Sequence, residues 1–137
     1  MRVRDDRLLQ IAFLAGAITD AAALLPMLSP DFAGLLWGLQ DTAGSYRLAM
    51  GSGASLMLGW TILLLWAYRR PIERRAVAAF TIVVIAGFVV TEMWAVQTGV
   101  LAAVRMAPTF VLQSVLAGLF AAALYCGRER GTVATEL

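Results

Sequence analysis

Apolar residues fill four long stretches of this chain and leave only short polar segments between them. The stretches cover residues 8–28, 48–68, 76–99 and 108–126, so each holds 19 to 24 residues. As α-helices they would be roughly 28 to 36 Å long, enough to cross the hydrocarbon core of a bilayer. The pattern predicts an all-α bundle of four antiparallel transmembrane helices. We expect one integral membrane domain over residues 1–137, with a polar tail at 127–137.

The segment between the first two stretches predicts a short helix. Ser29 suits an N-cap, Pro30 the first helical position and Asp31 the first turn. The apolar residues that follow end at Leu39, after about ten positions, which is too few to cross a bilayer. We expect this helix to lie in the membrane interface or to fold back over the bundle. Residues 40–47 then form a polar return.

The other connections are short. Residues 69–75 join the second and third spans, so we expect these two helices to be antiparallel neighbours. Residues 100–107, which include Arg105, are predicted as a loop, with Pro108 in the first turn of the fourth span. The first stretch could instead be a cleaved signal peptide. It is too long for the apolar region of such a peptide and contains Asp20, so we interpret it as a membrane span.

The charges predict how the bundle is oriented. Of the residues, 61% are apolar and only 15% are charged, too few to cover a soluble domain of this length. All the basic residues are arginines, and a four-span topology puts nine of them on one side: Arg2, Arg4, Arg7, Arg69, Arg70, Arg74, Arg75, Arg128 and Arg130. Only Arg47 and Arg105 fall on the other side. By the positive-inside rule both termini are cytoplasmic.

The connection between the second and third spans carries Arg69, Arg70, Arg74 and Arg75. These arginines act as topology signals. They could also attract anionic lipid, at roughly 1 kcal/mol for each residue near the surface.

Missing residue types exclude several kinds of chemistry. The chain has no histidine, so it cannot itself supply an imidazole ligand for haem, zinc or iron. It has no lysine for a Schiff base, and Cys126 is its single cysteine, so no internal disulfide or dithiol pair can form. We expect no cofactor and no metal site, and the sequence favours a role other than catalysis.

Two carboxylates fall inside predicted spans. Asp20 and Glu92 lie about eight and seven residues from the outer ends of their helices, which puts both roughly 10 to 12 Å deep. An acid at the bilayer centre costs roughly 2.5–3.5 kcal/mol, so each should face protein, water or a cation. Other polar side chains fall near the same level: Thr91, Ser55 and Gln113. We expect an outward-opening polar pocket in which Arg47 or Arg105 pairs with the acids.

The acids support two interpretations. They could simply form hydrogen bonds to neighbouring helices. Such contacts contribute on average only about 0.6 kcal/mol to stability. Alternatively, they could form a site that binds or translocates a small ligand, a proton or an ion, because an ionisable residue inside the membrane is a functional candidate. A lipid- or isoprenoid-modifying enzyme with an acid pair is a further hypothesis. It requires both carboxylates to reach the same substrate.

Small residues predict close helix packing. They recur at four-residue spacing in the second span (Gly51, Ser55, Gly59) and in the fourth (Ser114, Gly118, Ala122). Such stripes let helix backbones approach each other. The alternative function is therefore a non-catalytic accessory subunit that docks through these stripes onto a membrane partner or a second copy of the chain.

Residues 50–61 and 66–75 carry a resemblance. The first run begins Met50-Gly51-Ser52-Gly53, and the second contains the arginine-rich connection. Together they resemble small prokaryotic four-helix membrane proteins without an assigned function and, more distantly, the DoxX-like group. The resemblance implies a multi-pass protein of the prokaryotic cytoplasmic membrane and, for some DoxX-like proteins, a quinone-linked oxidoreductase subunit. It carries over no catalytic residues.

Overall fold

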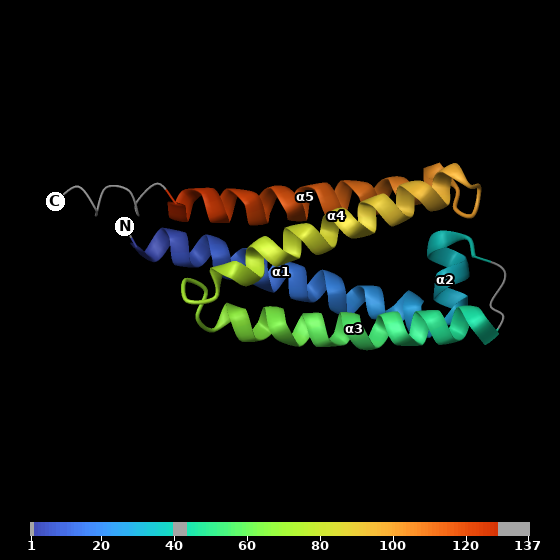
Figure 1. Cartoon of the computed structure of the whole chain (residues 1–137), viewed down its shortest axis with the longest axis horizontal. Helices are drawn as coiled ribbons and strands as arrows, with labels where there is room; N and C mark the ends of the chain where they lie inside the picture. The colour runs from blue at the N-terminus through green and yellow to red at the C-terminus, as the bar shows by residue number, and fades with distance from the viewer. Residues whose placement is uncertain (1, 40–43, 129–137) are drawn as a thin grey trace.

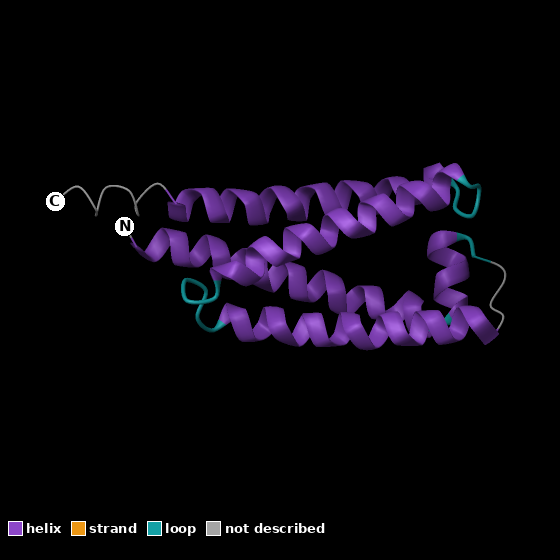
Figure 2. Ribbon diagram, viewed as in Figure 1, coloured by secondary structure: helices purple, strands orange, loops and turns teal. Residues whose placement is uncertain are grey.

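The computed structural model describes residues 2–39 and 44–128, and this part of the chain forms five helices (Figure 1). The four long helices are α1 (Arg2–Leu28), α3 (Gly44–Tyr68), α4 (Arg75–Gln97) and α5 (Ala103–Arg128). The short helix α2 (Pro30–Trp37) lies across one end of the bundle. No strand occurs in the described residues (Figure 2). The predicted all-α architecture, with a short helix after the first span, is confirmed.

Each long helix contains a segment that is long and apolar enough to cross a membrane: Arg7–Leu28, Gly44–Tyr68, Arg75–Gln97 and Ala103–Tyr125. Large apolar side chains on these helices face outward, among them Leu56 at 78% exposed and Val104 at 87%. A water-soluble protein rarely exposes so much contiguous apolar surface, whereas a lipid-facing surface requires it. The fold is therefore that of a multi-pass membrane protein.

Helix α1 is the centre of the bundle. It packs against α3 on one side and α5 on the other. Its buried stripe consists of apolar residues and one glycine at helical spacing: Leu9, Ala12, Phe13, Gly16 and Ala17. Phe13 meets Phe120 of α5 edge to face, with ring centroids 5.9 Å apart. Fully buried Leu64 of α3 belongs to the same core cluster.

This core occupies the half of the bundle that contains the α3–α4 connection. Its residues come from the first half of α1, the last turns of α3, the start of α4 and the end of α5. Figure 1 shows the start of α1, the end of α5 and the α3–α4 connection at the same end of the bundle, with α2 at the other. The hydrophobic core therefore lies in the half of the bundle away from α2.

The expectation that the second and third spans are neighbours holds only in part. Helices α3 and α4 are antiparallel, but α3 packs mainly on α1 and α4 mainly on α5. They converge only at their connection, residues 69–74, and diverge toward α2 (Figure 1). A six-residue connection permits this divergence because it does not hold the helix ends in contact.

Three helices begin at least four residues earlier than predicted. Helix α1 starts at Arg2 instead of residue 8. Helix α3 starts at Gly44 instead of residue 48, so residues 44–47 are helical, while residues 40–43 of the predicted polar return lie outside the described part. Helix α5 starts at Ala103 instead of Pro108, which lies inside it. The break is Gly99, whose φ of 76° suits glycine. Pro108 cannot donate a backbone hydrogen bond, yet α5 continues through it.

Candidate functional site

A cavity lies among the long helices in the half of the bundle next to α2. It has two adjoining chambers, which we name by position. The outer chamber, about 490 Å³, is lined by all five helices. The inner chamber, about 410 Å³, lies nearer the core and is lined by α1, α3, α4 and α5. Each is large enough for a small organic molecule. The chambers share five lining residues: Asp20, Met27, Met57, Phe88 and Leu116.

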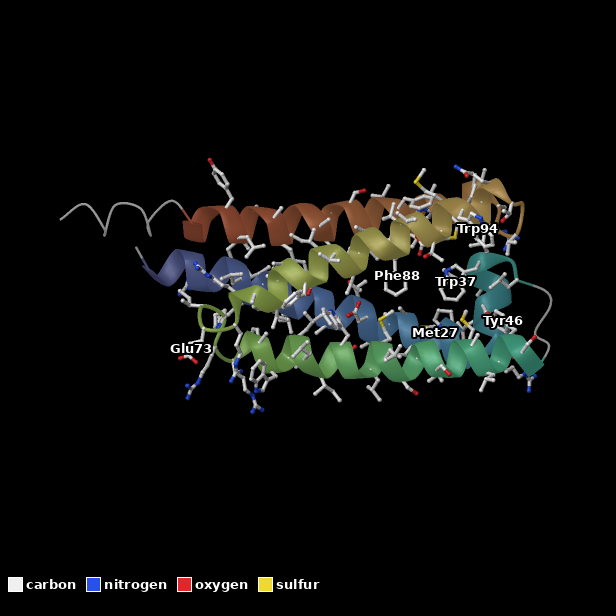
Figure 3. All side chains as sticks on the ribbon, viewed as in Figure 1. Met27, Trp37, Tyr46, Glu73, Phe88 and Trp94 are labelled. Carbon is white, nitrogen blue, oxygen red and sulfur yellow. The ribbon has the colours of Figure 1, made fainter. Side chains whose placement is uncertain are left out.

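The divergence of α3 and α4 explains how the cavity reaches the surface. Leu56 lines the inner chamber yet is 78% exposed, and Phe88 on the opposite helix is also exposed. The rim of the inner chamber therefore reaches the lipid-facing surface between α3 and α4. At the end of the bundle where α2 lies, Leu36 and Trp37 of α2 form part of the wall of the outer chamber. Figure 3 shows Trp37, Phe88 and Met27 around this space. The structure therefore shows a lateral rim at the inner chamber, and the outward opening stays a prediction.

Asp20 is the charged residue common to both chambers. It lies on the same stripe of α1 as Gly16 and Met27, at helical spacing, which places all three on the cavity wall. Its side chain is half-buried and makes no hydrogen bond or ion pair to the described residues. An acid in such surroundings is available to a ligand.

Glu92 lines the outer chamber from α4 and has a different environment. Its Oε1 accepts a hydrogen bond of 3.0 Å from Nε2 of Gln113 on α5. The remaining oxygens of the pair, Oε2 of Glu92 and Oε1 of Gln113, are buried and have no hydrogen-bond partner in the described part of the chain. The structure thus places Asp20, Glu92 and Gln113 on one cavity, and the Glu92–Gln113 contact connects α4 to α5.

Arg105 does not pair with the acids, contrary to expectation. It lies in the first turn of α5, and its Nη1 donates to the carbonyl oxygens of Gly34 (3.4 Å) and Leu35 (3.3 Å). Both carbonyls belong to the last turn of α2, which carries the negative end of the helix dipole, and the Gly34 oxygen also accepts the Gly38 N–H at 3.0 Å. Gly38 ends α2 with a φ of 73°. Arg105 therefore holds α2 against α5 over the outer chamber.

Three other predicted site residues lie off the cavity. Arg47 is exposed near the start of α3 and forms no ion pair with the described residues. Ser55 and Thr91 are also exposed, and each hydroxyl donates back to its own helix, to Gly51 and Gly87 respectively. The predicted set is therefore divided, with only Asp20, Glu92 and Gln113 lining the chambers.

The small-residue stripes face away from the bundle. An added Cβ at Gly51, Gly59 or Gly118 would meet nothing within 4 Å, and Ser114 is exposed with its hydroxyl bonded to Phe110. The stripes therefore do not pack helices within this chain, and their docking role stays a prediction. The glycines that do permit close contact are Gly16, facing Phe120 and Leu64, and Gly53, facing Met27.

In the arginine-rich connection, two of the four arginines contact nearby residues of the chain. Arg70 forms an exposed ion pair with Glu73 at 3.3 Å. The Arg74 guanidinium stacks 3.3 Å from the ring centroid of Trp66 and donates a hydrogen bond to the Trp66 carbonyl. Arg69 and Arg75 are exposed. Attraction of anionic lipid to these residues stays a prediction.

Sequence reasoning missed the aromatic and sulphur-containing residues of the cavity. Trp37, Trp60, Phe88, Met27 and Met57 all line a chamber. A usable signal existed for two of them. Phe88 lies four residues before Glu92 and Met27 seven after Asp20, so each shares a helical face with an acid.

Within the described residues, no three His, Cys, Asp or Glu side chains come together as a metal site would require. Comparison of the chain with protein-family models, curated sequences and solved structures finds no match. The resemblance to DoxX-like proteins therefore stays a prediction.

Proposed function

We propose that this protein binds a small, largely apolar cation that enters the cavity from the bilayer and is held by Asp20. One observation carries the proposal: the Asp20 carboxylate faces a mainly apolar cavity and has no partner among the described residues. A carboxylate removed from water is costly unless it is paired. A cationic ligand would supply the charge that the protein does not.

The cavity wall supports this ligand class. Aromatic rings line it from four helices: Trp37, Trp60, Phe88 and Phe120. Aromatic faces attract cations, with contributions of about 0.5–2 kcal/mol each. The methionines and aliphatic residues around them suit the apolar body of such a ligand.

The lateral rim supports entry from the membrane. An apolar cation is concentrated in the bilayer, and the inner chamber reaches the lipid-facing surface beside Leu56. Such a ligand would not need to cross the end of the bundle that α2 covers.

The test is equilibrium binding of tetraphenylphosphonium to the protein in lipid nanodiscs, with empty nanodiscs subtracted. Asp20→Asn should weaken binding at least tenfold, which corresponds to about 1.4 kcal/mol. Asp31→Asn is the matched control, since Asp31 is an exposed acid on α2 outside both chambers. It should bind like the wild type. Equal binding by wild type and Asp20→Asn would refute the proposal.

We further infer that the end of the bundle with the arginine-rich connection is cytoplasmic, in a prokaryotic inner membrane. The arginine distribution supports this orientation. In a Cys126→Ala background, an impermeant maleimide should label Val100→Cys in intact cells, and Ile72→Cys only after permeabilisation. Both positions are exposed. Ile72 lies in the α3–α4 connection and Val100 in the α4–α5 connection, and Figure 1 shows these connections at opposite ends of the bundle. The reverse labelling pattern would contradict the orientation.

A further inference from the structure

The Glu92–Gln113 contact leaves two buried oxygens without donors. One hydrogen bond joins the side chains, from Gln113 Nε2 to Glu92 Oε1 at 3.0 Å. Glu92 Oε2 and Gln113 Oε1 are buried and receive no donor from the described residues. Buried polar atoms in proteins are nearly always satisfied, and an orphan carboxylate oxygen is more costly than a neutral one.

An ionised Glu92 cannot remove this deficit. A carboxylate and an amide oxygen both accept hydrogen bonds, and only the amide nitrogen donates. Rotating the Gln113 amide by half a turn would place its oxygen against Glu92 Oε1, so that two acceptors would face each other. In either orientation an ionised pair leaves buried acceptors unmatched.

One proton on Glu92 satisfies both atoms. We propose that Glu92 is a neutral carboxylic acid whose Oε2–H donates to Gln113 Oε1, closing a ring of two hydrogen bonds with the Nε2–H···Oε1 bond. A carboxylic acid and a primary amide have matching donors and acceptors for this ring. Glu92 is then a structural contact between α4 and α5, and Asp20 is the single anionic group of the cavity.

The groups around Glu92 favour the neutral form. Across the outer chamber lies Asp20 of α1, and a second negative charge in the same mainly apolar cavity would repel it. No cation compensates: Arg105 of α5 is bonded to α2, and Arg47 of α3 lies off the chamber. The other polar groups on the wall, Thr19, Thr109 and Trp37, make no hydrogen bond to Glu92.

This assignment gives the two acids different roles: Glu92 joins two helices, and Asp20 binds the ligand. The neutral state of Glu92 is inferred from the two oxygens without donors and from the charged groups around the pair, and it does not depend on the proposed function. The consequence for the ligand, that a single positive charge suffices for recognition, rests on the proposed function. A monocation should therefore bind in preference to a dication of similar size.

The test is infrared spectroscopy of the protein in lipid nanodiscs at neutral pH, without ligand. A neutral carboxyl C=O stretch is separate from the bands of ionised carboxylates. We expect one neutral carboxyl band that shifts when glutamate is labelled with ¹³C, that is retained in Asp20→Asn and that disappears in Glu92→Gln. The isotope shift requires no mutation, so it remains informative if a variant fails to fold. Glu92→Gln should fold, because two amides can form the same ring.

Absence of a neutral glutamate band in the wild type would overturn the inference, as would a band lost in Asp20→Asn and kept in Glu92→Gln. These readings do not involve tetraphenylphosphonium. A neutral glutamate band in a protein that does not bind tetraphenylphosphonium would refute the proposed function. It would still support the acid–amide pair of Glu92 and Gln113.

Discussion

The Gly16→Leu variant is expected to unfold at a much lower temperature than the wild-type protein. A Cβ at this position would come within 3.1 Å of the Phe120 ring and 3.2 Å of a Leu64 methyl group. Both neighbours are fully buried in the core between α1, α3 and α5, so neither can move away freely. Overpacking of this kind costs about 1–3 kcal/mol, and leucine adds three more carbons beyond the Cβ. We expect a loss at or above the top of that range.

The matched control is Gly118→Leu on α5. It gives the same gain in helix propensity, about 0.8 kcal/mol, but its Cβ meets nothing within 4 Å. Thermal unfolding in nanodiscs, followed by circular dichroism, should separate the two variants clearly. If Gly118→Leu were as destabilising as Gly16→Leu, the inference that three helices approach closely at Gly16 would be contradicted.

The Ala23→Trp variant is expected to abolish tetraphenylphosphonium binding while Asp20 remains in place. Ala23 lines the outer chamber, so an indole there would occupy the space that the ligand needs. The substitution fills an existing cavity, and we therefore expect little change in stability. Binding should fall by at least a hundredfold, or about 2.7 kcal/mol.

Ala21→Trp provides the comparison. Ala21 is exposed on α1 and lines neither chamber, so its indole should face lipid and leave binding intact. Full binding by Ala23→Trp would mean that the ligand sits elsewhere. Loss of binding in both variants would mean that bulk anywhere on α1 matters more than occupancy of the chamber.

The length of the apolar stretches was enough to predict the four long helices, because backbone groups in lipid must be satisfied within each helix. The short helix α2 followed from Pro30 and the limited apolar run after it. The similar level of Asp20 and Glu92 along the bundle was readable by the same counting, and both line the outer chamber. Axial position along a membrane helix is therefore well encoded in the sequence.

Rotation about the helix axis is encoded poorly. A membrane helix is apolar on every side, so its hydrophobic pattern does not identify the buried face. For this reason the conspicuous stripe of Gly51 and Gly59 was expected to pack, although it faces outward, and Gly16 was overlooked.

The prediction that Arg105 pairs with the acids was wrong for a different reason. Its acceptors are backbone carbonyls of α2, 70 and 71 residues earlier in the chain, and no local pattern indicates such a contact. Only the packing of α2 against α5 brings them together.

The most direct measurement is photolabelling of the protein in nanodiscs with a photoactivatable analogue of tetraphenylphosphonium, with the modified residues mapped by mass spectrometry. We expect adducts on chamber residues such as Met27, Met57 and Phe88, suppressed by excess unlabelled cation and by Asp20→Asn. Adducts confined to outward-facing residues such as Ile62 and Val83, with the chamber residues unmodified, would contradict this expectation.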